Sequence, residues 1–316
     1  MELSYAQNLE DYHLSLAFEG QSTGTYIDIG AGHPIADSVS FWFYERGWQG
    51  IVVEPQPELA ALYQRLRPRD LAVRGLVGRQ CGEVDFYTVE RLHGLSTTVK
   101  DLAQKAQTFG VDYQTVRMPV TTLAKLCEAH DVGSVDFLKI DVEGAEGDVL
   151  FGGDWKRFRP KVIVVEAITP LSLEPAWQEW EPFLVAQGYR LVLFDTLNRF
   201  YVAEEQREIM ARFPSERASW HAVRHMHEIG RAPENRQHPD HALAQDLAHG
   251  FWAMLPYLDA DLIASILSRA RRIATPEEFA SLASTVNSEA FRAAIGRVAC
   301  GYDGGQIVAE GDAGTA

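Results

Sequence analysis

The sequence predicts an α/β protein with a mostly parallel sheet, followed by a separate all-α region. Over roughly the first two thirds of the 316 residues, short apolar runs alternate with helical patterns, which is typical of helices covering both faces of a parallel sheet. Two strand-like runs near residue 200 stand too close together for a parallel connection. Beyond about residue 205, only helical patterns follow.

The expected strands are short apolar stretches, and most are separated from the next by enough residues for a helix. They are Tyr26–Ile29, Gly50–Glu54, Leu71–Val77, Val135–Asp141, Val162–Glu166 and Leu191–Asp195. The segment "CGEVDFYTV" (81–89) alternates with a period of two and predicts an additional extended segment. In "YRLVLFDTLNRFYVAEE" (189–205), the short link Thr196–Asn198 allows only an antiparallel hairpin, so the last strand runs against the sheet.

Composition divides the chain into residues 1–205, a helical region 206–300 and a tail 301–316 that is rich in glycine and is expected to be disordered. Helical spacing is clearest in "LAQDLAHGFWAMLPYL" and "DADLIASILSRARRIA". These helices carry enough apolar positions to pack against either the α/β domain or a second subunit. We therefore expect the C-terminal helices to support a homo-oligomer.

Charge and cysteine content exclude several classes of protein. The net charge of −15 opposes binding to the phosphates of nucleic acid. No apolar stretch approaches the roughly 18 residues that a membrane span needs. The three cysteines are far apart in sequence, so they form neither a disulfide framework nor a CxxC metal site. These features predict a protein of the reducing cytoplasm.

The stretch "TYIDIGAGHP" (25–34) leads a strand into a turn of two glycines. The turn Gly30-Ala31-Gly32 lets the backbone bend tightly beside a ligand, and we expect a helix to begin near Asp37. Glu54 ends the next strand 24 residues after Gly30, where an acid can bind the hydroxyls of a ribose. The pattern predicts a site for a nucleotide-like cofactor.

Two cofactors compete for this site. A fold that binds a nicotinamide dinucleotide requires a third glycine in the motif G-x-G-x-x-G. In this sequence Ile35 occupies that position and follows Pro34. The antiparallel hairpin at 189–204 also differs from an all-parallel dinucleotide sheet and suits the sheet of S-adenosylmethionine-dependent methyltransferases. S-adenosylmethionine is therefore the favoured cofactor, and NAD is the alternative.

Acidic residues gather where the fourth and fifth expected strands end. In "VDFLKIDVEGAEGDVL" (135–150), a buried strand delivers Asp141 and Glu143 to the edge of the sheet where ligands bind. Glu166 ends the fifth strand, and adjacent parallel strands lie about 4.8 Å apart. The carboxylates of Asp141 and Glu166 could thus converge, and would then share a proton or bind a hard cation such as Mg²⁺.

Several ordered blocks together give the chain a resemblance to the FkbM-type methyltransferases over about residues 4–205. The blocks are "YAQNLED" (5–11), "YIDIGAGHP" (26–34), "FYERGWQGIVVEPQP" (43–57), "LST" (95–97), "VDFLKIDVEGAE" (135–146), "KVIVVEA" (161–167) and "LNRFYVAEE" (197–205). The resemblance implies a class I methyltransferase (Rossmann-like) fold. It also implies S-adenosylmethionine as the methyl donor and O-methylation of hydroxyls in sugars, glycans or natural products.

The resemblance also implies roles for particular residues. Asp28, Gly30 and Gly32, with Ala31 between them, would line the donor pocket, and Glu54 would bind the ribose. Four polar residues would lie in an N-terminal helix that covers the pocket: Gln7, Asn8, Glu10 and Asp11. The family pattern does not reach the last hundred or so residues, whose role stays open.

A sugar hydroxyl needs a base or a metal to take its proton before it attacks a methyl group. Asp141 is the leading candidate for this base, and the other candidates are Glu143, Glu166 and His33. Two further functions remain as alternatives. One is a nicotinamide-dependent oxidoreductase, and the other is a catalytically silent binding or scaffold protein on the same fold.

Overall fold

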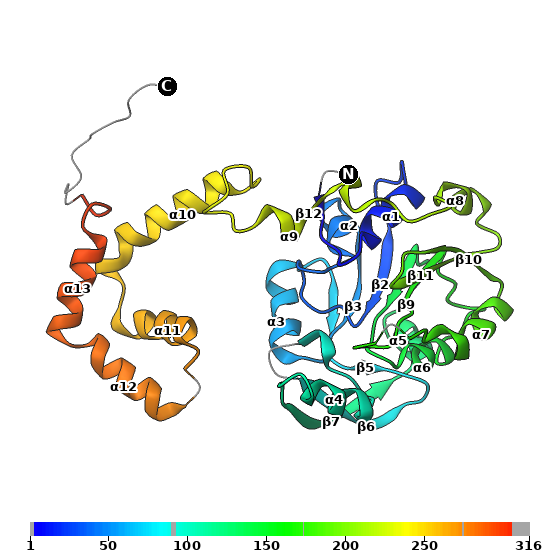
Figure 1. The fold of residues 1–316 in the computed structure, drawn as a ribbon, viewed down its shortest axis with the longest axis horizontal. Helices are drawn as coiled ribbons and strands as arrows, with labels where there is room; N and C mark the ends of the chain where they lie inside the picture. Colours follow the sequence, from blue (N-terminus) through cyan, green and yellow to red (C-terminus); the bar gives the residue numbers. More distant parts are fainter. Residues whose placement is uncertain (1–2, 90–92, 173, 274, 305–316) are drawn as a thin grey trace. The chain divides into compact units, whose positions relative to one another are not determined.

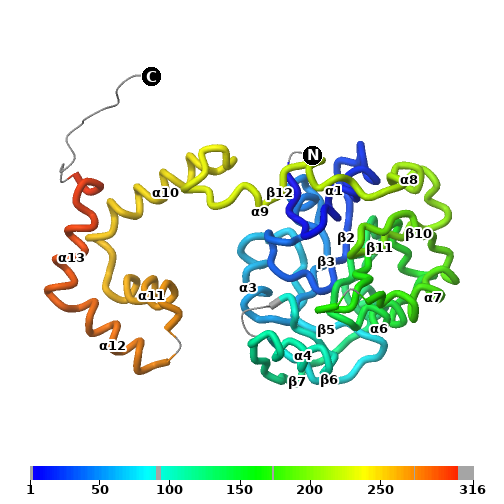
Figure 2. Tube along the Cα trace, viewed as in Figure 1, coloured from blue at the N-terminus to red at the C-terminus, as the bar shows by residue number. Residues whose placement is uncertain are grey.

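The structure is a computed structural model that describes residues 3–89, 93–172, 174–273 and 275–304. The chain divides into two compact units, Met1–Met226 and His227–Ala316. The first unit extends past residue 205 because β12 (Arg224–His225) pairs in parallel with β1 (Leu3–Ser4) near the N-terminus (Figure 1, Figure 2). Most of the expected tail, residues 305–316, lies outside the described residues.

The first unit is built on a mixed sheet of seven strands in the order β10-β11-β9-β8-β2-β3-β4. The strands are β2 (Thr25–Ile29), β3 (Gln49–Val53), β4 (Leu71–Val73), β8 (Phe137–Ile140), β9 (Val162–Glu166), β10 (Tyr189–Phe194) and β11 (Asn198–Ala203). The pairs from β9 to β4 are all parallel, whereas β11 is antiparallel to both of its neighbours. The predicted α/β class and the antiparallel hairpin are confirmed.

Alternating side chains of the sheet form two separate hydrophobic cores, one on each face. Ile27, Leu138 and Ile163 belong to one core, whereas Tyr26 and Phe137 belong to the other. The first core includes buried residues of α5 (Leu123–Ala129), α6 (Glu146–Phe151) and α7 (Glu181–Ala186). The second core is packed by α1 (Glu10–Ala17), α2 (Phe41–Glu45), α3 (Pro57–Leu66) and α8 (Arg207–Arg212).

A smaller three-stranded sheet, ordered β5-β7-β6, follows β4. The single strand expected over Leu71–Val77 is wrong, because the chain leaves the main sheet after Val73 and Leu76–Val77 (β5) pairs in the small sheet. The extended segment expected at 81–89 is confirmed as β6 (Gly82–Val89). Its partner β7 (Tyr113–Thr121) was not foreseen. Between them lie η1 (His93–Leu95) and α4 (Lys100–Gln107).

Two helices begin later than the sequence suggested. Gln7 and Asn8 precede α1 rather than lying in it, because Leu9 has a φ of 65° and so takes a left-handed conformation at the N-cap. The helix expected near Asp37 begins at Phe41, since Asp37 itself has a φ of 56°. Both segments therefore reach the edge of the sheet as loops.

The second unit is helical. Its main elements are α10 (His241–Met254), η4 (Leu255–Tyr257), α11 (Ala260–Arg271), α12 (Pro276–Val286) and α13 (Glu289–Ala299). Side-chain caps begin three of them, and α12 has a full capping box between Thr275 and Glu278. Among the described residues, no helix of either unit is long and apolar enough to cross a membrane.

Candidate active site

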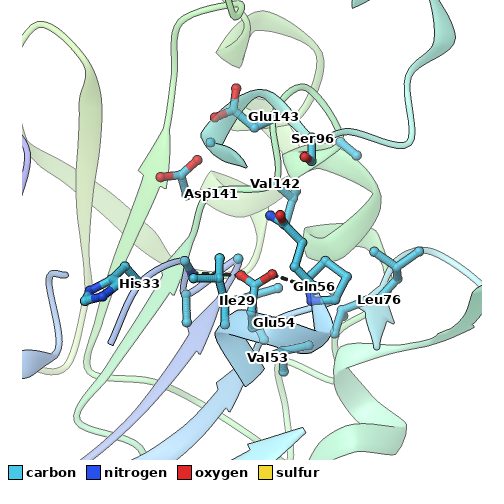
Figure 3. Close-up of a pocket in the computed structure, with 18 of the residues that line it drawn as sticks. Ile29, His33, Val53, Glu54, Gln56, Leu76, Ser96, Asp141, Val142 and Glu143 are labelled. Carbon is cyan, nitrogen blue, oxygen red and sulfur yellow. Dashed lines mark hydrogen bonds between the residues drawn. The ribbon is translucent and has the colours of Figure 1, made fainter. Parts of the chain in front are cut away.

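A cavity of about 480 Å³ lies where β2, β3 and β8 end. This is the edge at which open parallel sheets bind ligands, and the volume falls in the usual range for a small-molecule site. Eight of the predicted site residues line the cavity: Gln7, Gly30, Ala31, Gly32, His33, Glu54, Asp141 and Glu143. Figure 3 shows Asp141 and Glu143 together on one side of Glu54.

The two glycines of the turn serve different purposes. Gly30 has a φ of 75°, and a Cβ there would lie 1.7 Å from the backbone oxygen of Asp141. Gly30 is thus required for packing against the neighbouring strand, and not, as expected, for contact with a ligand. Gly32 has a φ of 61°, and a Cβ there would meet nothing within 4 Å. It is Gly32 that leaves open space in the cavity wall.

Glu54 is held in the cavity by the backbone. One of its carboxylate oxygens accepts the N–H of Gly32 at 2.9 Å, and the other accepts the N–H of Gln56 at 2.7 Å (Figure 3). Burial raises the pKa of Glu54 to about 7, against the opposing effect of these two hydrogen bonds. Each oxygen keeps a free lone pair. A fixed carboxylate of this kind can accept hydrogen bonds from both hydroxyls of a ribose.

His33 lines the cavity, but its ring is used by the local turn. Nδ1 accepts the backbone N–H groups of Ile35 at 3.1 Å and of Ala36 at 3.0 Å. Burial also lowers the pKa of the ring. In the neutral imidazole that these bonds require, Nε2 carries the hydrogen, so no lone pair remains to accept a proton. This geometry does not support His33 as the base.

Lys139 is a buried cation beside the acids. Its Nζ lies 3.0 Å from a carboxylate oxygen of Asp141 and 3.9 Å from one of Asp28. Burial alone lowers its pKa, but the charges of Asp141 and Asp28 outweigh this effect and raise it. Lys139 thereby stays charged and fixes the carboxylate of Asp141. Lys139 lies within the strand predicted over Val135–Asp141. Its role could not be predicted from the sequence, because its partners depend on the register of β2 against β8.

Asp28 does not line the cavity as expected. It is a buried residue of β2 and is not among the residues that line the cavity. Its carboxylate accepts a hydrogen bond from the hydroxyl of Ser40 at 2.6 Å. Its other oxygen faces Lys139. Asp28 therefore contacts Lys139 and Ser40 beneath the cavity wall and is too buried to contact a ligand directly.

Asp141, Glu143 and Glu166 come together as the positions of the strand ends suggested. Each offers a carboxylate oxygen, and these oxygens lie within 4.8 Å of one another. Burial and then the charges of Asp141 and Glu143 raise the pKa of Glu166 well above its ordinary value. A hydrogen bond with Asp141 acts in the same direction. The raised pKa favours the protonated form of Glu166, which can donate such a bond.

The loop after β8 positions Glu143. Glu143 has a φ of 56°, and its carbonyl oxygen accepts the hydroxyl of Thr97 at 2.7 Å. Glu146 closes the same loop, because its carboxylate accepts the N–H groups of Val142 and Gly144 at 3.1 and 3.0 Å. Burial, followed by the charge of Asp141, raises the pKa of Glu143. Thr97 belongs to the "LST" block, which therefore supports the acidic cluster.

Only Gln7 of the N-terminal block reaches the cavity. Asn8 does not line it, and instead donates a hydrogen bond at 3.0 Å to the carbonyl of Asp195 in the β10–β11 hairpin. Glu10 accepts the backbone N–H of Asn8 at 2.7 Å and the side chain of Asn198 at 2.6 Å. These bonds fix the loop that carries Gln7 to the same hairpin. Asn8 and Glu10 therefore position the loop that carries Gln7 and do not line the cavity themselves.

Fold and site together define an α/β protein whose small-molecule cavity opens at the carboxyl ends of its parallel strands, with an acidic cluster on one side. A family model described as the methyltransferase FkbM domain matches residues 28–191, just over half of the chain. The chain belongs to the FkbM methyltransferase family.

Other comparisons are less informative. No curated protein matches the chain significantly. A solved structure, described as CalO1, a methyltransferase in calicheamicin biosynthesis in its SAH-bound form, is 15% identical with a TM-score of 0.30. The match covers 61% of this chain and 54% of that one, so the chain spans about half the length of that structure.

Proposed function

We propose that this protein transfers a methyl group from S-adenosylmethionine to a hydroxyl of a sugar, glycan or natural product. The observation that carries the proposal is one cavity joining the glycine turn, the fixed carboxylate of Glu54 and the acid Asp141. Membership of a methyltransferase family supports it. The residues suit the donor, because Glu54 has free lone pairs for a ribose and Gly32 leaves space beside it.

The donor supplies an electrophilic methyl group on a sulfonium, and the chain supplies position and proton transfer. Glu54 would hold the ribose hydroxyls of the donor, and Gly32 would leave room beside them. Asp141 would accept the proton that the acceptor hydroxyl loses on methylation. Lys139 holds the carboxylate of Asp141 in place through a contact of 3.0 Å. Glu143 lines the same side of the cavity and orients the acceptor.

The alternatives have less support. A nicotinamide dinucleotide needs a helix N-terminus directly after the glycine turn to receive its diphosphate. Here α2 begins only at Phe41, and its five residues offer little of a helix dipole. A silent scaffold protein would have no need for Asp141 and Glu166 to be brought together in a partly buried cluster, because carboxylates that repel one another there cost stability.

The acceptor can be identified by mass spectrometry. Candidate saccharides and natural products are incubated with the full chain and methyl-labelled S-adenosylmethionine, and the products are analysed. We expect one class of hydroxyl compound to gain a single labelled methyl group. Methylation at nitrogen or at a carboxylate instead would contradict O-methylation, while leaving the donor as proposed.

A cation at Asp141 and Glu166 is the second candidate mechanism, and the close approach of the three carboxylates favours it. Hard cations such as Mg²⁺ prefer carboxylate oxygens, so these residues suit one chemically. We propose proton transfer without a metal, because the ammonium of Lys139 already pairs with the carboxylate of Asp141 at 3.0 Å. We therefore expect full activity after treatment with EDTA. Activity that is lost in EDTA and restored by Mg²⁺ would instead assign the cluster to a cation.

A further inference from the structure

Helix α10 in the second unit leaves a whole apolar face exposed. None of its residues is buried. Leu243, Leu247, Phe251 and Met254 are 59, 65, 36 and 53% exposed. With 3.6 residues per turn, these four positions and Gly250 fall on one side of the helix, and we call them the α10 stripe. A contiguous apolar face of this kind marks an interaction site.

The hydrophobic core of the second unit does not include the residues of the α10 stripe. That core is formed by four buried residues of α11 and α12, namely Ile263, Ala264, Leu282 and Val286. His249 and Trp252, which lie outside the stripe, pack near the ring of Tyr302 with centroid distances of 5.8 and 6.2 Å. A helical unit with so small a core gains little stability alone and benefits from a partner.

We propose that two copies of this chain associate through the α10 stripe, with the two α10 helices antiparallel and crossing at Gly250. The stripe is nearly symmetric about this residue. Leu243 and Leu247 lie seven and three positions before Gly250, and Met254 and the exposed Tyr257 lie four and seven after it. A two-fold axis at Gly250 therefore places Leu247 of one copy beside Ala253 and Met254 of the other, and Leu243 at the level of Tyr257, which follows α10 in η4.

Gly250 suits the crossing point. A glycine in the middle of a helix costs about 1 kcal/mol relative to alanine, so it needs a reason. A Cβ at Gly250 would meet nothing within 4 Å in the isolated chain. Packing inside one copy therefore does not explain the glycine. A close approach of two helix backbones does, because a residue without a side chain lets the two backbones come closest at the axis.

Charge and area agree with a second copy as the partner. Two copies that each carry −15 repel one another, so contact requires a patch without facing acids. Asp246 is the one carboxylate of α10, and in the antiparallel pairing it lies at the level of Met254 of the other copy rather than of another acid. The exposed parts of the stripe and Tyr257 amount to roughly 500 Å² per copy, or about 1,000 Å² in total, which reaches the lower range of specific interfaces.

Sedimentation velocity of the full chain tests the association. We expect wild-type protein at micromolar concentration to have twice the 35.3 kDa mass of one chain. Leu247→Glu places a charge in the stripe and should give a monomer with an unchanged circular dichroism spectrum. Ala242→Glu adds the same charge to an exposed position of α10 outside the stripe and should remain a dimer. A monomeric wild type, or a dimer that survives Leu247→Glu, would overturn the proposal.

A cysteine tests the crossing point independently of any loss of folding. In the background Cys81→Ser, which removes an exposed native thiol, Gly250→Cys should form a disulfide-linked dimer under mild oxidation. Cysteines at a two-fold axis lie within the Cβ–Cβ distance of about 4 Å that a disulfide needs. Ala242→Cys in the same background should stay largely uncrosslinked. Equal crosslinking of the two variants would show that the helices do not cross at Gly250.

Discussion

Asp141→Asn is expected to lower kcat by about 100-fold or more while the dissociation constant of the donor changes by less than about twofold. The substitution keeps the size of the side chain but removes the carboxylate that we propose as the proton acceptor. Donor binding should persist because Glu54, the proposed ligand of the ribose, lies on the other side of the cavity. Single-turnover rates measure the first effect, and titration with S-adenosylhomocysteine measures the second.

The matched control is Asp148→Asn. Asp148 lies seven residues further along, in α6, and pairs with Arg79 outside this cavity. Its side chain is 54% exposed, so its replacement should leave both kcat and donor affinity unchanged. If Asp141→Asn retained kcat within about twofold, or if the two variants lost activity equally, proton transfer would have to be assigned to another group.

Glu54→Ala is expected to weaken donor binding by about 1.5–3 kcal/mol, which corresponds to roughly 10- to 150-fold in the dissociation constant. The variant removes a charged acceptor for the ribose hydroxyls and also the anchor for the N–H groups of Gly32 and Gln56. Glu58→Ala removes an exposed carboxylate four residues away and should have no effect. Donor affinity that is equal in both variants would place the ribose elsewhere.

The pKa of Glu54 also predicts a pH dependence for donor binding. Burial raises this pKa to about 7, so the carboxylate is protonated below that pH and ionised above it. The ionised form is the stronger hydrogen-bond acceptor. Donor affinity should therefore fall as the pH is lowered through about 7. Glu54→Gln cannot ionise, and its weaker affinity should be independent of pH over this range.

The main lines of the fold could be read from the sequence because they depend on local patterns. Buried parallel strands give continuous apolar runs such as Val162–Glu166, and a three-residue link near Thr196 permits only a hairpin. The strand β7 could not be foreseen. Its sequence, "YQTVRMPVT", contains a proline and exposed polar residues, and it is ordered only by pairing with β6.

The site could be predicted where a residue follows a strand end, as for Glu54, Asp141 and Glu166. Contacts between distant segments could not. Gly30 is required because the carbonyl of Asp141 approaches it across the sheet, and that approach depends on register. The burial of Asp28 and its pairing with Lys139 also depend on the register of β2 against β8. His33 differs, because its Nδ1 binds two backbone N–H groups within three residues, a local turn that the sequence analysis did not consider.

Titration calorimetry of the full chain with S-adenosylhomocysteine, and separately with NAD, measures most directly whether this cavity holds the proposed methyl donor. We expect S-adenosylhomocysteine to bind at one site per chain, with an affinity that Glu54→Ala reduces, and NAD to give no measurable heat of binding. Saturable binding of NAD together with no binding of S-adenosylhomocysteine would contradict a methyltransferase site in this cavity.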